Sequence, residues 1–290
     1  YEPFRRNISI IIDSYKQEVV MKLLVQGDDY GFTKAVTYGI REGIQNGILR
    51  NTGLFTNMPS AELAVSLMKE MPEACFGIDF NIVSGPSVSN PKDIPHLVDE
   101  NGEFIRSGAR LRDPKFATEE GRRELSPYDE TYREIRAQYD KFVEMTGKKP
   151  GYLHAHSLRH ENYMDAIRAV SEETGIPFSM DLQKKYGFIS MRDIRSAKGI
   201  VDKASQKKVF DPNDQLNKNP LKDVLDNFDE LLKHEYVCIG GHPGFVDADL
   251  LDLTTLSLER VRDLQMVTSP VLRKLVEENK VELITYYDLY

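Results

Sequence analysis

The chain has 290 residues, of which 40% are hydrophobic and 29% charged, as is typical of a globular protein with a substantial core. Its formal net charge is −8 and it has no dense run of Lys and Arg, so the sequence predicts neither a nucleic-acid nor a membrane partner. The two cysteines, Cys75 and Cys238, lie far apart and outside any CxxC motif, which predicts core residues of a protein in the reducing cytoplasm.

The first twenty residues do not share the pattern that follows them. Their apolar run, Ile8–Ile12, is too short to cross a membrane and stops at Asp13 without the small residues of a cleavage site. Met21 directly precedes the first convincing strand. We therefore expect residues 1–20 to be an N-terminal extension outside the core fold, with a docking helix or arm as the alternative. Residues 21–290 are expected to form one domain.

The first predicted strand ends in two adjacent carboxylates. The run Lys22–Val25 is short, apolar and partly β-branched, and it leads into Asp28 and Asp29. Successive side chains on an extended segment point to opposite faces, so one carboxylate is placed to bind a metal ion while its neighbour faces a water molecule. Asp, Gly and the following Thr33 also favour a turn that caps the next helix, and both interpretations stay open for the pair alone.

Helix and strand patterns alternate after this motif. Val36, Ile40, Ile44 and Ile48 recur at helical spacing, and later apolar segments predict a strand at 53–55, a helix at 61–71 and a strand at 76–82. From about residue 84 to 128 the pattern gives way to Pro, Gly, Asp and Ser, which predicts a long irregular loop insertion. Such an insertion is either a substrate-covering segment or a surface loop.

Three of the six histidines, His154, His156 and His160, lie within seven positions. They follow a predicted helix that has one apolar face around residues 135–143 and ends at Gly147. In an extended segment His154 and His156 share a face, whereas in a helix His156 and His160 do. Either geometry directs two imidazoles toward one ion, and imidazoles with a carboxylate suit a divalent metal. Packed or hydrogen-bonded histidines are the alternative.

A third stretch repeats the arrangement of the first. The apolar run Tyr236–Ile239 leads into a turn that contains His242. A lone histidine in a Pro-Gly turn is the plainer interpretation. In α/β folds with parallel strands, however, groups from several strand ends converge on one face, so the residues of all three stretches are expected to meet there. A last apolar run at 281–285 predicts a final strand.

These segments together resemble the YdjC-like family of carbohydrate deacetylases, which includes chitooligosaccharide deacetylases. The resemblance covers Met21–Leu289 and rests on the order and spacing of short motifs: Asp28-Asp29-Tyr30-Gly31, Thr56-Asn57-Met58-Pro59, Gly77-Ile78, Arg133-Glu134 through Gln138 and Phe142, the histidine cluster, His242-Pro243-Gly244, and the Leu283–Asp288 ending. It implies an α/β fold, a single-domain irregular (β/α) barrel of the TIM-barrel type. It also implies metal-dependent removal of an N-acetyl group from an amino sugar.

The resemblance assigns roles by position. Asp28 corresponds to the general base that activates a metal-bound water, and His242 to a histidine that aids the leaving amine or orients the substrate. His160 is the alternative acid for the leaving amine, and His154 and His160 are the alternative residues for the metal or acid role. Asp29 and His156 correspond to metal ligands. Aromatic residues beside the site are candidates for stacking on a sugar, with core packing as the alternative: Tyr30, Phe245, Phe32 and Tyr152.

Two positions depart from the family pattern. Asp79 stands where the family places a metal-binding histidine, and His154 stands where it places an aspartate. One hypothesis is that these changes compensate, with His154 or His160 supplying the imidazole and Asp79 binding the metal or accepting a hydrogen bond beside it. The other is that the metal site is weakened or lost. An added carboxylate favours Mg²⁺ or Mn²⁺ over Zn²⁺.

The sequence thus leads to three functional hypotheses. The first is a divalent-metal-dependent deacetylase acting on short chitooligosaccharide-type sugars. The second is a metal-dependent hydrolase of another amide or of a phosphoester. The third is a catalytically degenerate homologue that only binds sugar. The expected partner is a small carbohydrate substrate, and a homodimer is left open.

Overall fold

The computed structural model describes residues 20–199 and 212–290. The expected N-terminal extension, residues 1–20, therefore lies outside the described residues apart from Val20. One sheet contains seven strands: β1 (Lys22–Tyr30), β2 (Asn51–Leu54), β3 (Cys75–Phe80), β4 (Leu153–Ala155), β5 (Ile189–Ser190), β6 (Tyr236–Gly241) and β7 (Glu282–Ile284).

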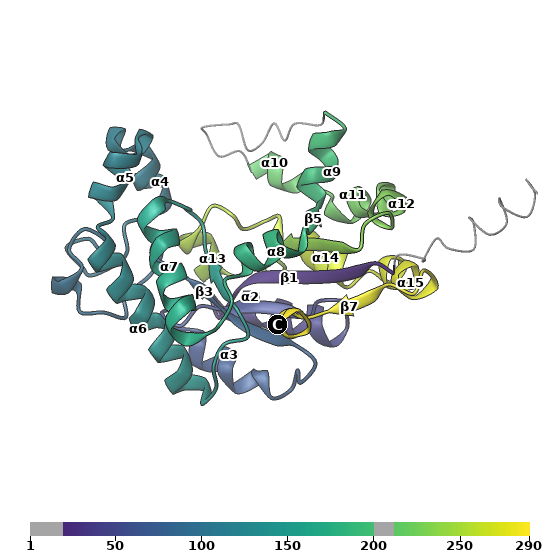
Figure 1. The fold of residues 1–290 in the computed structure, drawn as a ribbon, viewed down its shortest axis with the longest axis horizontal. Helices are drawn as coiled ribbons and strands as arrows, with labels where there is room; N and C mark the ends of the chain where they lie inside the picture. Colours follow the sequence, from purple (N-terminus) through teal and green to yellow (C-terminus); the bar gives the residue numbers. More distant parts are fainter. Residues whose placement is uncertain (1–19, 200–211) are drawn as a thin grey trace, which may run out of the picture.

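Helices connect and surround these strands (Figure 1). The α-helices are α2 (Lys34–Gln45), α3 (Ala61–Met68), α4 (Ser107–Arg112), α5 (Glu119–Leu125), α6 (Tyr128–Thr146), α7 (Glu161–Thr174), α8 (Ser179–Tyr186), α9 (Met191–Ala197), α10 (Pro212–Leu216), α11 (Pro220–Asp226), α12 (Phe228–Leu231), α13 (Ala248–Leu253), α14 (Arg260–Val267) and α15 (Pro270–Glu278). The 3₁₀ helices are η1 (Pro91–Asp93), η2 (Pro114–Ala117) and η3 (Tyr286–Leu289).

The sheet is parallel throughout, in the order β4-β3-β2-β1-β6-β5, with β7 also paired to β1. Figure 1 shows β1 crossing the middle of the molecule, with α4 to α7 at the left of the view and α9, α11 and α12 above the right half of the strand. Parallel strands bring their carboxyl ends to one edge, where groups from different strands can meet. The predicted α/β class with an irregular barrel is confirmed.

The irregularity of the barrel arises at β1. Residues Lys22–Leu24 of this strand pair with β7, whereas its residues from Gln26 onward pair with β2 on the same side. The side chain of Asn51 fills the branch point, because its amide nitrogen donates to the carbonyl oxygens of Val25 and Ile284, each at 3.1 Å. A buried amide thus replaces the ladder bonds that the branching sheet cannot make.

A β-bulge changes the direction of β1 near its carboxyl end. Gly27 pairs with Thr52 and Tyr30 pairs with Leu54, so β1 has one more residue than β2 over this stretch. Asp29 adopts φ +75°, a left-handed conformation that is rare for a non-glycine residue. Its backbone N–H donates to Asp79 Oδ2 at 2.8 Å instead of to the neighbouring strand. The predicted strand is therefore longer than expected and includes both aspartates.

The insertion at residues 84–128 is not the irregular loop that its composition predicted. It contains η1, α4, η2 and α5, whose α-helices have 6 and 7 residues, too short for a helical period to be visible in the sequence. The buried Glu134 carboxylate of α6 accepts hydrogen bonds from the backbone N–H groups of Val88 and Ser89 at 3.0 and 2.8 Å. Glu134 thereby fastens the insertion to α6.

The other predicted elements are found close to their expected positions. The strands expected at 53–55, 76–82 and 281–285 correspond to β2, β3 and β7. Helix α6 ends at Gly147, which adopts the left-handed conformation with φ +67°. Both cysteines are free and buried in the core, as predicted.

Candidate active site at the carboxyl end of the sheet

Three side chains from three strands converge at the carboxyl edge of the sheet. Asp28 of β1, Asp79 of β3 and His154 of β4 each offer one ligand atom, and these atoms lie within 4.8 Å of one another. Asp79 is 0% exposed and His154 is 7% exposed, whereas the Asp28 side chain retains 18% exposure. The cluster is therefore buried on two sides and accessible through Asp28.

Asp79 and His154 are direct partners across the sheet. They are paired in the parallel register of β3 and β4, and they are the two positions at which the resemblance implied an exchange of aspartate and histidine. An exchange between register partners keeps one carboxylate and one imidazole at the same place in the sheet. Gly53 of β2 makes room for it, because a Cβ atom there would lie 2.1 Å from Asp79 Oδ1. The hypothesis that the two changes compensate is thus consistent with the geometry.

The donor set of this cluster fits a divalent cation. Asp79 Oδ1 is buried without a hydrogen-bond partner. Burial, followed by the neighbouring charges of Asp28 and Asp29, holds the pKa of Asp79 well above its usual range. A cation would supply the missing partner and reverse this preference. Burial lowers the pKa of His154, which favours the neutral imidazole that metals bind.

Asp29 and His156 lie beside this cluster and bind each other. Asp29 Oδ1 is 2.9 Å from His156 Nδ1, and its Oδ2 accepts a hydrogen bond from Arg260 Nη2 at 2.6 Å. Burial raises the pKa of Asp29, but Arg260 and His156 outweigh it and hold that pKa well below the usual range. Only Oδ2 of Asp29 accepts a hydrogen bond, because Oδ1 is buried without a hydrogen-bond partner despite its contact with His156. In this arrangement the expected ligands Asp29 and His156 form an ion-pair network next to the Asp28, Asp79 and His154 cluster.

His160 lies apart from the cluster and is not paired with His156 on a helix. It is the N-cap residue of α7, and its ring packs against Phe116 and Tyr163 with centroid distances of 6.3 and 5.7 Å. Its Nδ1 atom is buried without a partner. Burial, and then the charge of Arg110, lowers the pKa of His160 to about 4.

His242 follows β6, as the sequence predicted. Its backbone N–H donates to Asp263 Oδ2 at 2.9 Å, which fixes the turn after the strand. His242 directly follows Gly241, which pairs with Gly27 of β1, so it stands next to the segment that contains Asp28 and Asp29. All three informative stretches of the sequence therefore meet at one edge of the sheet.

The four aromatic candidates for substrate contact differ in exposure, and one of them is on the surface. Tyr30 is 0% exposed and its hydroxyl donates to the carbonyl oxygen of Ala64 at 2.8 Å, so it has no free face for a sugar and packs in the core. Phe32 and Tyr152 are buried as well. Phe245 is 45% exposed and follows the His242 turn, so it remains a predicted substrate contact.

Arg260 is the residue that the sequence interpretation missed. It is 1% exposed, although a buried arginine is uncommon, and its guanidinium lies 5.6 Å from the ring of Phe32. A signal was present: Arg260 and Asp263 stand at the helical spacing of Leu264 and Val267, which form the apolar face of α14. Charged residues on an apolar stripe indicate buried ionic partners.

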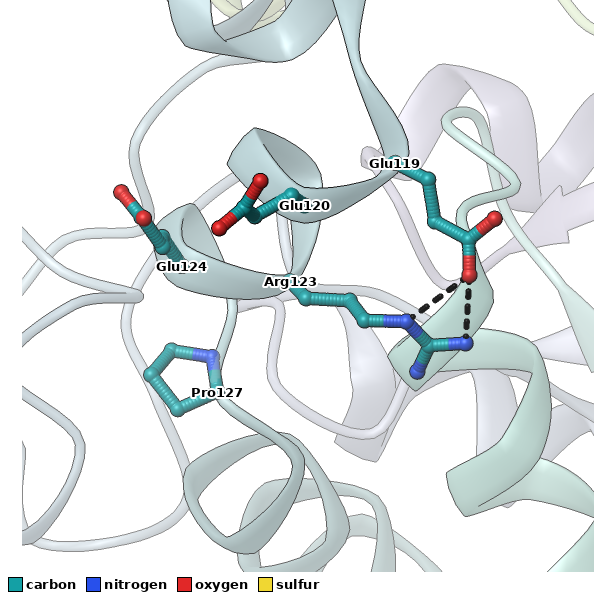
Figure 2. A pocket seen from close by; sticks show the side chains of 5 residues that line it. All are labelled: Glu119, Glu120, Arg123, Glu124 and Pro127. Carbon is teal, nitrogen blue, oxygen red and sulfur yellow. Dashed lines mark hydrogen bonds and ion pairs between the residues drawn. The ribbon is translucent and has the colours of Figure 1, made fainter.

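A surface hollow at α5 contains none of these residues. It is lined by Glu119, Glu120, Arg123, Glu124 and Pro127, and two of these, Arg123 and Glu119, form an ion pair (Figure 2). We assign it no function. Within residues 20–199 and 212–290, no helix is both long and apolar enough to cross a membrane.

Comparisons with known proteins agree on one family. Residues 22–278 match the family model described as YdjC-like protein. The chain is 33% identical to "Carbohydrate deacetylase 2" of Listeria innocua over 93% of this chain and 99% of that protein. It is 24% identical to "Chitooligosaccharide deacetylase" of Proteus mirabilis over 92% and 98% of the two chains.

A solved structure supports the fold. It is of an Enterococcus faecalis V583 protein named as a candidate cellobiose-phosphate cleavage protein, and it superposes with a TM-score of 0.71 at 21% identity. The superposition covers 93% of this chain and 99% of that one.

The buried His160 ring predicts a pH-dependent stability. Its folded pKa of about 4 lies below the unfolded value near 6.5, so the unfolded chain binds more protons between these values. The contribution of His160 is complete above pH 6.5 and is lost as the pH falls toward 4, a change of about 3 kcal/mol. His160→Phe keeps the ring packing and should make the free energy of unfolding depend less on pH between about 4 and 6.5. Urea unfolding at several pH values measures it, and equal slopes for both proteins would contradict the prediction.

The Asp29–Arg260 pair predicts a large loss of stability when it is broken. Asp29→Asn should lower the free energy of unfolding by about 3–5 kcal/mol, because a buried guanidinium loses its counter-charge. The matched control is Asp140→Asn, which breaks an exposed pair with Arg136 and should cost less than about 1 kcal/mol. Urea denaturation compares the two variants. Similar losses would show that the buried pair does not anchor the site.

Because Oδ1 of Asp79 has no hydrogen-bond partner, removing the charge of this residue should affect the stability of the metal-free protein and its response to metal in opposite ways. Asp79→Asn should leave the metal-free protein at least as stable at pH 7, because it removes a buried carboxylate beside two others. It should also abolish the rise in melting temperature that Mn²⁺ or Mg²⁺ produces in the unaltered protein. Glu134→Gln is the control, since it changes a buried carboxylate outside the cluster and should retain the metal response. Calorimetric melting with and without metal tests this, and a full response in Asp79→Asn would exclude Asp79 as a ligand.

Proposed function

The chain belongs to the YdjC-like protein family, and from this premise we propose that it is a divalent-metal-dependent hydrolase that removes the N-acetyl group from short amino-sugar oligosaccharides. One observation carries the proposal: Asp28, Asp79 and His154 converge at the edge of the sheet in a chain whose relatives are named carbohydrate and chitooligosaccharide deacetylases. The substrate is then a small carbohydrate of the chitooligosaccharide type.

Asp79 and His154 would hold the cation, and Asp28 would face it from β1. A bound divalent ion would polarise the acetamide carbonyl and make water a better nucleophile near neutral pH. A carboxylate with one imidazole makes a harder donor set than three imidazoles, which supports Mg²⁺ or Mn²⁺ over Zn²⁺. His156 is held by Asp29, so in this proposal it contributes to the electrostatics of the site and orders its rim.

Asp28 is our proposed proton acceptor. Among the three aspartates it alone keeps exposed side-chain surface, 18%, because the Asp29 and Asp79 side chains are fully buried. Its Oδ2 atom is 3.9 Å from His154 Nε2 and so faces the cluster. We propose that it takes the proton of the attacking water and that His242 protonates the departing amine.

Compartment is a further part of the proposal. The two cysteines are free, buried and on different strands, β3 and β6, which supports residence in a reducing compartment such as the cytoplasm.

The reaction class can be tested by acetate release. After treatment with a chelator and addition of Mn²⁺, Mg²⁺ or Zn²⁺ alone, the protein should release acetate from N-acetylated chitooligosaccharides. Mass spectrometry of the product should show the loss of one acetyl group. Release of phosphate from a phosphoester panel without acetate would favour the phosphoesterase alternative. Sugar binding without turnover under every metal would favour the degenerate homologue.

Two substitutions test the roles of the proposed acid and base. Asp28→Asn and His242→Gln should each lower kcat by about 10²–10⁴-fold, as expected for the loss of a general acid or base. His234→Gln is the matched control, because His234 precedes β6 at the opposite end from His242. Measured turnover of Asp28→Asn near that of the control would remove Asp28 as the base.

A further inference from the structure

The His242 turn, residues 242–247 between β6 and α13, is bound by the first turn of α14. The N–H of His242 donates to Asp263 Oδ2 at 2.9 Å, and the N–H of Gly244 donates to the carbonyl oxygen of Arg260 at 3.3 Å. Arg260 and Asp263 are the first and fourth residues of α14, so they lie on one face of the helix. Because the side chain of Arg260 also binds Asp29, this face supports both Asp29 and the backbone at His242.

Two glycines let the turn pack directly against β1 and α2. A Cβ atom on Gly39 of α2 would lie 2.5 Å from the Cα atom of Gly244. A Cβ atom on Gly27 of β1 would lie 2.7 Å from the Cγ atom of Pro243. These contacts block movement of the turn toward either element, since the packing leaves no free space there. The hydrogen bonds to α14 restrict movement in the remaining direction.

Asp263 requires a counter-charge, because its side chain is only 2% exposed. Lys218 supplies it, with its Nζ atom 3.3 Å from Oδ1 and 3.4 Å from Oδ2 of Asp263. The same nitrogen lies 3.1 Å from Glu259 Oε1. Burial lowers the pKa of Lys218, but the charges of Asp263 and Glu259 outweigh it and raise that pKa above its usual value. Within residues 20–199 and 212–290, Lys218 is the one cation in an ion pair with Asp263.

Lys218 comes from a different part of the chain, the link between α10 and α11. Gln215 of α10 fastens this link to the segment before α14. Its Oε1 atom accepts hydrogen bonds from the backbone N–H groups of Ser257 and Glu259 at 3.0 and 3.2 Å. Its Nε2 atom donates to the carbonyl oxygen of Thr255 at 2.7 Å. Because the N–H of Lys218 donates to the carbonyl oxygen of Gln215, the docked glutamine places the lysine beside α14.

We propose that Asp263 and Lys218 are positioning residues for His242: Asp263 fixes the backbone N–H of His242, and Lys218 holds the Asp263 carboxylate in place. The imidazole is attached to the Cα atom next to that N–H, so a shift of the turn moves the ring. Displacement of a reacting group by about 1 Å can lower a rate by about 10²-fold. The catalytic consequence rests on the proposed function, in which His242 protonates the departing amine. The placement of the turn does not depend on it.

Amide hydrogen exchange of the full-length protein, followed by ¹⁵N NMR, tests this anchor without a substrate. The His242 amide should exchange about 10–100-fold faster in Asp263→Ala than in the unaltered protein, because its hydrogen bond to a charged group is lost. The amides of β6 should keep their protection in the variant, which shows that the sheet is folded. Unchanged exchange of the His242 amide in Asp263→Ala would overturn the proposal.

Substitutions of Lys218 provide the second readout and leave the carboxylate in the protein. Lys218→Met should speed the exchange of the His242 amide and lower kcat by about 10–100-fold with little change in KM. Lys218→Arg keeps the positive charge and should retain most of the protection and of kcat. The matched control is Lys222→Met, because Lys222 forms an exposed ion pair with Asp226 on the neighbouring helix α11. Equal His242 exchange and equal kcat in Lys218→Met and Lys222→Met would overturn the proposal.

The deacetylase function and the positioning role fail in different ways. Absence of acetate release from the unaltered protein, together with faster His242 exchange in Asp263→Ala and Lys218→Met, contradicts the function and supports the anchoring of the turn. Acetate release with unchanged His242 exchange in both variants supports the function and contradicts the positioning role. Acetate release with faster exchange but an unaltered kcat contradicts the catalytic part of the proposal.

Discussion

Three aspartates share one buried edge of the sheet, and their mutual repulsion is the constraint on which the site depends. Asp28, Asp29 and Asp79 lie close enough for each of the first two charges to raise the pKa of Asp79. Arg260 places its positive charge against Asp29 and thereby permits the carboxylate to be fully buried. No comparable cation among the described residues is bonded to Asp79, so a bound metal ion is the natural counter-charge for the remaining pair.

Much of this arrangement was readable from the sequence. The strand that ends in Asp28 and Asp29, the histidine cluster and the His242 turn each showed an apolar run followed by titratable groups, and parallel topology brings such ends together. The exchange at positions 79 and 154 was visible as a departure from the family pattern. That the two positions are paired could be known only from the register of β3 and β4.

What the sequence did not show depends on contacts between distant segments. Asp29 was expected to bind metal, but the partner that engages it, Arg260, is 231 positions away. The β-bulge at Asp28 and Asp29 is a shift in register between β1 and β2, so it cannot be recognised from the sequence of β1 alone. Likewise, Tyr286 is an ordinary polar residue in the sequence, and only packing of η3 against α8 and β1 makes it the partner of both Gln183 and Gln26. The short helices of the insertion lacked the length that makes a period visible.

Gly53 lies against Asp79 at the site and contributes no side chain to it. A single methyl group at this position would occupy the space of Asp79 Oδ1, although Gly53 itself offers no group to a substrate or a metal. In a collection of related sequences, glycine at this position is therefore expected to accompany the pair of aspartate on β3 and histidine on β4. Such covariation would separate chains with this exchanged arrangement from those that retain the usual one, before any activity is measured.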